Sequence, residues 1–388
     1  SSVSSNRLSL GFDYAIYLKK SSDSELVLVV LYVSPGGPAE QAGLRRGDVI
    51  DKVGGSHITR SNYRSLLRSI DSPLQTCTLT MFKDGREISL SPREFHESPV
   101  LLQKIFDNGI DKIGYMVFNS FNMDADADLR EAGRFFRKNG VKELILDLRY
   151  NSGGYLMTER MLASMLAPKS AVEAEELYSV NVFNKYINEA IGDKSKRESR
   201  LSFDFEYELE GVKHKFSTAD ANIGISKLYI LTGPRTASAS ESLICCVSAF
   251  MPVEIIGVRT VGKFCGGQLF KGSDWYERNN TRSKRVYHDS SMGDWCIYMM
   301  TAMWTDKSGG NSAYPSGISP DIELKEFPLD RIPLGDAREV LLSRALQRAG
   351  FGGTIRPSGK YAKSSGRESS YNIYYDGEIK PLRALRIE

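Results

Sequence analysis

The chain has 388 residues, of which 41% are apolar and 26% are charged, a composition typical of soluble globular proteins. Its 51 Lys and Arg residues nearly balance its 48 Asp and Glu residues, and the net charge of +3 argues against a dedicated nucleic-acid binder. The length predicts two or three domains, and no apolar run approaches the roughly 18 residues of a membrane span.

The five cysteines and four histidines show no ligand spacing, since there is no Cys-x-x-Cys and no His near another His or a Cys. We therefore expect free thiols, no metal site and no organic cofactor. The segment Ser1–Asn6 lacks the charged and apolar regions of a signal peptide, which leaves the location undecided.

Residues 8–97 are predicted to form one β-rich unit. Turn residues such as Ser34-Pro35-Gly36-Gly37-Pro38 punctuate its apolar runs. The predicted elements are a strand at 26–33, a short helix at 39–42, a helix at 62–70 and a hairpin of 77–82 and 87–90.

Residues 98–350 are predicted to form an α/β core, because strands alternate with helices from residue 113 onward. The predicted strands are 113–118, 143–148, 227–231 and 253–258, and the predicted helices are 126–139, 157–166 and 237–250. We expect a linker or a hinge at 98 to about 110, a β-hairpin insertion at about 170–222, and a C-terminal arm or partly disordered tail at about 351–388.

A candidate nucleophile, Ser238, lies where a strand ends, a Gly-Pro turn follows and small residues open a helix. Backbone N–H groups and the helix dipole favour developing negative charge at that position. The alternative is a simple capping box, because Glu241 follows Ser238 by three residues.

Two further segments carry candidate chemistry. Lys263 lies in a Gly-rich, mostly apolar loop after a core strand, where a neutral amine could accept a proton from a serine. Gly153 and Gly154 follow another strand at the edge where α/β sheets bind ligands, and they allow close backbone approach to an oxyanion. A surface lysine and an ordinary glycine loop are the alternatives.

Together these segments resemble the carboxyl-terminal processing (tail-specific) serine peptidases. The matching runs are Thr236–Glu241, Gly262-Lys263, Leu146–Gly154 and Pro315–Asp321. Lys263 follows Ser238 by 25 residues, which is the family's spacing.

The resemblance implies a crotonase-like (ClpP/crotonase) α/β core with Ser238 as nucleophile and Lys263 as general base. It implies Gly153 and Ala239 as oxyanion donors. The family often has a glutamine four residues after the lysine. Gln268 lies five residues after Lys263, so it is the candidate lysine orienter if a one-residue bulge restores its position.

The N-terminal unit resembles a PDZ domain through Pro38–Ile50 and through Ser9-Leu10-Gly11-Phe12. PDZ domains pair an extended peptide with a sheet edge and hold its terminal carboxylate on loop amides. The resemblance implies that Leu10, Gly11 and Phe12 form this loop. A small β-rich domain without a ligand is the alternative.

The sequence thus predicts a serine endopeptidase that acts on proteins with exposed C-terminal segments. A bacterial envelope or periplasmic location is implied by the resemblance, and the oligomeric state is left open. The alternatives are a catalytically silent PDZ and peptidase-like binding protein, and a crotonase-like acyl-CoA enzyme, which would leave the PDZ unit and the Ser–Lys spacing unexplained.

Overall fold

The computed structural model describes residues 6–19, 22–209, 211–271 and 295–351. The C-terminal arm expected from residue 351 therefore lies almost entirely outside the described residues. Within those ranges, no helix is long and apolar enough to cross a membrane.

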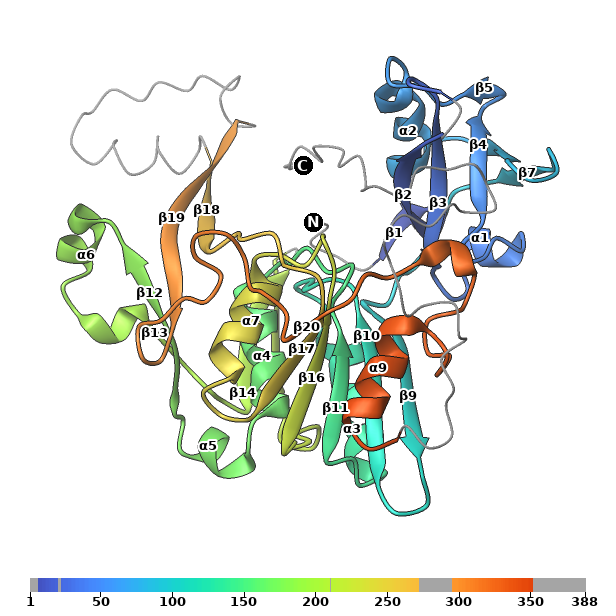
Figure 1. Cartoon of the computed structure of the whole chain (residues 1–388). Helices are drawn as coiled ribbons and strands as arrows, with labels where there is room; N and C mark the ends of the chain where they lie inside the picture. Colours follow the sequence, from blue (N-terminus) through green and yellow to red (C-terminus); the bar gives the residue numbers. More distant parts are fainter. Residues whose placement is uncertain (1–5, 20–21, 210, 272–294, 352–388) are drawn as a thin grey trace, which may run out of the picture.

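The N-terminal unit contains a sheet in the order β2-β3-β4-β6-β7, with β5 paired to β4 (Figure 1). Its elements are β1 (Asn6–Ser9), β2 (Phe12–Leu18), β3 (Leu26–Val33), α1 (Pro38–Gln41), β4 (Val49–Val53), β5 (Ser56–His57), α2 (Tyr63–Asp71), β6 (Cys77–Met81), β7 (Glu87–Leu90) and β8 (Arg93–His96). Alternate residues of the strands pack with Leu67 and Ile70 of α2 in one buried cluster. The helices and the hairpin expected here are present within a residue or so of their predicted bounds.

The central sheet of the core has the order β20-β17-β16-β11-β10-β9. Its strands are β9 (Val100–Asp107), β10 (Lys112–Phe118), β11 (Glu143–Asp147), β16 (Lys227–Thr232), β17 (Val253–Gly257) and β20 (Ile322–Glu323). All neighbours are parallel except β9, which pairs antiparallel with β10. The linker expected at 98–110 is thus wrong for most of its length, because β9 forms the edge of this sheet.

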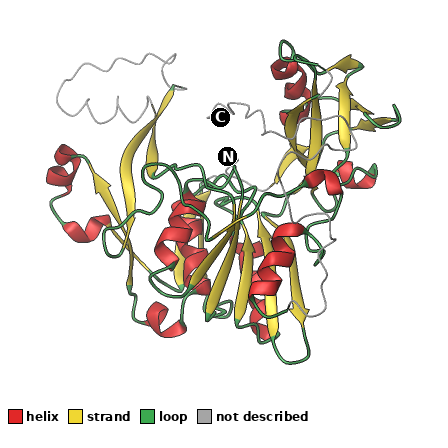
Figure 2. Ribbon diagram, viewed as in Figure 1, coloured by secondary structure: helices red, strands yellow, loops and turns green. Residues whose placement is uncertain are grey.

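Helices cover both faces of the central sheet (Figure 2). One face packs against α3 (Asp126–Lys138), α4 (Leu156–Leu166) and α7 (Ala239–Val247), and the other packs against α9 (Val340–Arg348). Successive residues of β10 divide between the faces: Tyr115 and Val117 join the α9 side, whereas Met116 and Phe118 join the other. Burial on both faces explains why these strands read as nearly continuous apolar runs.

A separate four-stranded sheet, in the order β13-β12-β19-β18, flanks the core (Figure 1). The elements of this region are α5 (Lys169–Glu173), β12 (Leu177–Phe183), α6 (Lys185–Ile191), η1 (Lys194–Arg197), β13 (Glu198–Arg200), β14 (Asp204–Leu209), β15 (Val212–Ser217), β18 (Cys265–Lys271) and β19 (Cys296–Asp306). The segment expected as a hairpin insertion does contain the β14–β15 hairpin. Its β12 instead pairs with β19, from a part of the chain more than a hundred residues away.

Buried polar contacts hold the PDZ-like unit against the core. Arg46, in the loop before β4, donates to the phenolic oxygen of Tyr150 and to Glu326 at 3.0 Å. Arg149, the residue before Tyr150, is fully buried and bonds within the core to Asp147 and to Glu339. The PDZ-like unit therefore contacts the loop that follows β11, and this loop also carries Gly153.

Candidate active site

Ser238 closes the turn between β16 and α7 in a conformation that non-glycine residues rarely adopt, with φ 57° and ψ −116°. The side chain is half-buried, and α7 begins at the next residue. A backbone outlier of this kind persists only when the surrounding structure enforces it, and such outliers cluster at functional sites. The first helical amides lack partners within the helix, so this end of α7 favours an anion.

Gly153 lies beside Ser238 and the following residue, Ala239, and the role of Gly153 and Ala239 as oxyanion donors stays a prediction. A Cβ built on Gly153 would lie 2.7 Å from the Cβ of Ser238 and 2.9 Å from the backbone nitrogen of Ala239. The N–H of Gly153 donates to Oδ1 of Asn151 at 2.8 Å. To serve an oxyanion, Gly153 must therefore share or exchange this hydrogen bond.

One carboxylate joins the serine turn to the lysine loop. Oε2 of Glu241 accepts from the N–H of Ser238 at 2.9 Å and from the N–H of Lys263 at 2.8 Å. Because both bonds end on one oxygen, the backbones of the two candidate catalytic residues lie within two hydrogen bonds of each other. The side chain of Lys263 is half-buried.

The other oxygen of Glu241 completes this connection. Oε1 accepts from the hydroxyl of Thr260 and from the N–H of Gly262 at 2.6 Å. Glu241 and Thr260 are both buried, so these hydrogen bonds are shielded from water. The sequence indicated Glu241 only as half of a capping box, and its bonds to the lysine loop were missed.

The run Pro315–Asp321 packs on the lysine loop. Thr260 exchanges hydrogen bonds with Ile318, whose N–H donates to the Thr260 hydroxyl at 2.7 Å. A Cβ on Gly262 would lie 2.7 Å from the backbone nitrogen of Gly317. The structure thus brings together all four sequence runs of the resemblance, at the carboxyl ends of β11, β16 and β17.

Gln268 lies on β18 opposite Met299. The register does shift between Gly266 and Gly267, where the sequence called for a bulge. These two residues pair with Ala302 and Met300, so the extra residue belongs to β19 and not to β18. The bulge in β19 therefore does not bring Gln268 to the position that the family's glutamine takes four residues after the lysine. The role of Gln268 stays a prediction.

The predicted peptide-binding loop connects β1 to β2. Leu10 and Gly11 are buried, and Phe12 opens β2. The N–H of Gly11 donates to Oγ of Ser9 at 3.0 Å, and a Cβ on Gly11 would meet the ring of Phe95 at 3.1 Å. Binding of a carboxylate by this loop stays a prediction.

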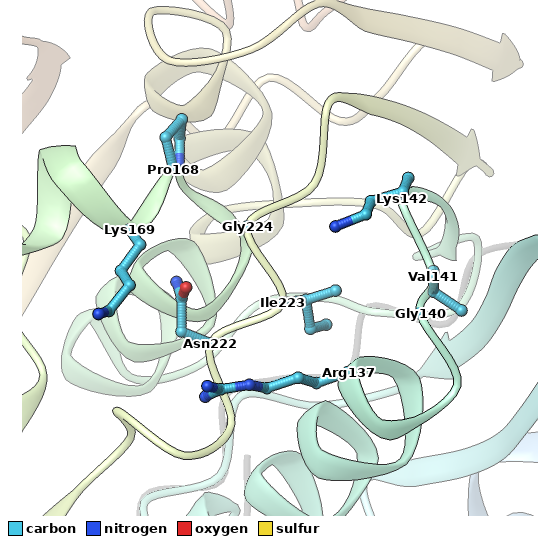
Figure 3. Close-up of a pocket in the computed structure, with 9 residues that line it drawn as sticks. All are labelled: Arg137, Gly140, Val141, Lys142, Pro168, Lys169, Asn222, Ile223 and Gly224. Atoms are coloured by element: carbon cyan, nitrogen blue, oxygen red, sulfur yellow. The ribbon is translucent and has the colours of Figure 1, made fainter.

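A pocket of about 360 Å³ lies at the opposite end of the core strands (Figure 3). Arg137, Lys142 and Lys169 line it; Arg137 donates to the carbonyl of Ala219, and Lys169 pairs with Glu173. Its walls include the segments that precede β11 and β16, whereas Gly153 and Ser238 follow these strands. It is therefore separate from the candidate active site.

The fold is an α/β core around a mostly parallel sheet, with a PDZ-like unit attached, and the serine turn and the lysine loop meet at the carboxyl ends of its strands. A model of peptidase family S41 matches residues 112–324, more than half of the chain, and a PDZ-domain model matches residues 29–78. The chain belongs to peptidase family S41. The resemblance to the carboxyl-terminal processing peptidases and the PDZ assignment are thereby confirmed.

Relatives agree with this assignment. The chain is 25% identical over 300 residues to a "Probable CtpA-like serine protease" of Staphylococcus aureus, which covers 76% of this chain and 50% of that protein. It is 32% identical over 134 residues to "Carboxyl-terminal-processing peptidase 2, chloroplastic" of Arabidopsis thaliana, covering 33% and 26%. The crystal structure of a Bacteroides fragilis "Putative S41 protease" matches with a TM-score of 0.63 at 25% identity, covering 89% of this chain and 83% of that one. The chain spans about half the length of the Staphylococcus relatives.

Proposed function

We propose that this chain is a serine endopeptidase of the carboxyl-terminal processing type with a crotonase-like core. Ser238 is the nucleophile, Lys263 the general base, and the N–H groups of Ala239 and Gly153 are the oxyanion donors. The observation that carries this proposal is the sharing of one Glu241 oxygen by the amides of Ser238 and Lys263. Family membership supports it independently.

In this mechanism, Oγ of Ser238 attacks the scissile carbonyl carbon while neutral Nζ of Lys263 takes the hydroxyl proton. Backbone N–H groups stabilise the tetrahedral oxyanion. Collapse expels the amine, which takes the proton from Lys263 and leaves an acyl-enzyme on Ser238. Lys263 then deprotonates a water molecule, and hydrolysis restores the serine.

The proposed substrates are proteins or peptides with exposed C-terminal segments, presented by the PDZ unit. Leu10, Gly11 and Phe12 would bind the terminal carboxylate, and the proposed location is the bacterial envelope. The PDZ match supports peptide binding, and the names of two relatives refer to carboxyl-terminal processing or to CtpA.

Cleavage of an unstructured protein tests the proposal. Ser238→Ala and Lys263→Ala should each abolish cleavage without unfolding the chain. Matched controls are Ser248→Ala, at the other end of α7, and Lys142→Ala, beside the remote pocket. Near-normal cleavage by either folded catalytic variant would show that the Ser–Lys assignment is wrong.

A catalytically silent binding protein is the remaining alternative. Labelling of Ser238 by a serine-directed fluorophosphonate probe separates the two functions, because a silent scaffold would not react. Loss of labelling in Ser238→Ala would confirm the attachment site.

A further inference from the structure

The PDZ-like unit touches the nucleophile turn through its outermost strand. In the described sheet β2 lies at the end of the strand order, so one of its edges has no strand beside it. An extended peptide that adds to a sheet edge needs the backbone N–H and C=O groups that point outward from such a strand.

The strand pairing shows which groups of β2 point outward. Tyr14 pairs with Val30 of β3, and the backbone groups of Val30 bond toward β4, to Asp48 at 2.9 Å and Gly47 at 2.8 Å. Antiparallel pairs alternate between hydrogen-bonded and non-hydrogen-bonded, and this pair is of the second kind. The N–H and C=O of Tyr14 therefore point to the outer edge of β2.

Both groups of Tyr14 are bonded by other side chains. Its N–H donates to Oδ1 of Asp13 at 2.8 Å, and its carbonyl accepts from Nη2 of Arg235 at 2.5 Å. Nη1 of Arg235 also pairs with Oδ2 of Asp13 at 3.0 Å. These side chains are only 18% and 13% exposed, so the ion pair is partly shielded from solvent.

Arg235 belongs to the turn of the proposed nucleophile and lies three residues before Ser238. The Asp13–Arg235 pair thus occupies the outer edge of β2 at Tyr14. Tyr14 is the second residue after Phe12, the last residue of the predicted carboxylate-binding loop. A peptide strand could not bond to Tyr14 while Arg235 does.

We infer that Arg235 and a peptide compete for the outer edge of β2, so that a peptide bound to the PDZ unit releases the nucleophile turn from it. The inference rests on the proposed function for the identity of the catalytic turn. Arg235 is then a positioning residue. A peptide at the outer edge of β2 displaces the Arg235 contact, and this affects the turn that carries Ser238.

Peptide binding to the full chain carrying Ser238→Ala tests this competition without cleavage. The probe is a short, unstructured, fluorescein-labelled peptide that ends in valine with a free carboxylate, and anisotropy gives its Kd. Adding Arg235→Met should tighten binding by about three- to tenfold, because the competing contact is lost. Adding Asp13→Asn should also tighten binding, because it weakens the same contact.

The two changes alter net charge in opposite directions, so a common increase in affinity cannot come from long-range attraction of the anionic peptide. The control is Arg134→Met on α3, which removes the ion pair between Arg134 and Asp220 and should leave Kd unchanged. Hydrogen exchange should also rise over residues 233–238 when peptide binds the Ser238→Ala chain.

Unchanged or weaker binding by the Arg235→Met variant would overturn the inference, since Arg235 would then only fasten the two units together. Failure of every variant to bind the peptide would overturn it too. The peptidase proposal is judged separately, by whether the unsubstituted chain cleaves an unstructured protein.

Discussion

Gly153 packs directly on Ser238, and a Cβ at Gly153 would approach the Cβ of Ser238 to 2.7 Å. The same atom would lie 2.8 Å from the carbonyl oxygen of Ala237, so neither neighbour could move aside without shifting the nucleophile turn. Gly153 also has a φ of 101°, which side chains disfavour. Backbone conformation and contact thus both require glycine at this position.

Gly153→Ala should therefore lower kcat by at least about a hundredfold, the effect of losing or misplacing one oxyanion donor. Gly140→Ala is the matched control, because Gly140 also has a positive φ, of 71°, but nothing lies within 4 Å of its Cβ position. That control should lose about 1 kcal/mol of stability and keep its activity. Equal kcat values for the two folded variants would contradict the placement of Gly153 beside the reacting atoms.

Glu241→Gln should lower kcat more than it raises KM. Oε2 of Glu241 accepts from the backbone N–H groups of both Ser238 and Lys263. An amide nitrogen in place of this oxygen would face two N–H donors and could accept from neither. We expect a loss of about ten- to a hundredfold in kcat, because the two loops separate. Glu173→Gln, an exposed change on α5, is the control. A raised KM with an unchanged kcat would place Glu241 in substrate binding instead.

The sequence could indicate where the candidate site residues lie in the fold, but not the hydrogen bonds that connect them. Ser238, Gly153 and the lysine loop could be placed because each follows a recognisable strand, and parallel strands end at the same sheet edge. The bonds from Glu241 to the lysine loop span 19 to 22 residues, and the bond from Arg46 to Tyr150 spans 104. Such contacts depend on how loops pack after folding, which local spacing does not encode.

The same limit explains the error at β9. Residues 100–107 are half-buried over most of their length, so their side chains do not show the strict alternation that indicates a strand. These residues form a strand because they pair with β10, and their own side-chain pattern does not indicate this. The antiparallel pairing of β18 with β19 was likewise not predicted.

Glu339 should support stability in acid through its contact with Arg149. Burial alone would raise the pKa of Glu339, but the attraction of buried Arg149 outweighs it and lowers the pKa to about 2. This contribution is present above the unfolded pKa of about 4.5 and is lost as the pH falls toward 2. Glu339→Gln should lower the free energy of unfolding at neutral pH by about 3 kcal/mol.

Urea denaturation at several pH values measures this effect. Asp336→Asn, which removes the ion pair with the exposed side chain of Arg338, is the matched control and should change stability little. A Glu339→Gln chain as stable as the control at neutral pH would show that the Arg149 contact contributes nothing.

Glu159 should produce the opposite trend, a loss of stability as the pH rises. Its carboxyl group is buried on α4, where the hydroxyl of Tyr178 donates to it, and burial raises its pKa to about 8. Between the unfolded pKa of about 4.5 and this value, the folded chain holds a proton that the unfolded chain releases. The free energy of unfolding should therefore fall by up to about 1.4 kcal/mol per pH unit across that window.

Glu159→Gln keeps the shape of the neutral acid and removes the titration, so denaturation curves from roughly pH 5 to pH 8 should show a shallower fall than those of the unsubstituted chain. Glu173→Gln, exposed on α5, should leave the slope as it was. If Glu159→Gln has the same slope as this control, Glu159 is ionised in the folded chain and the hydroxyl of Tyr178 donates to a carboxylate.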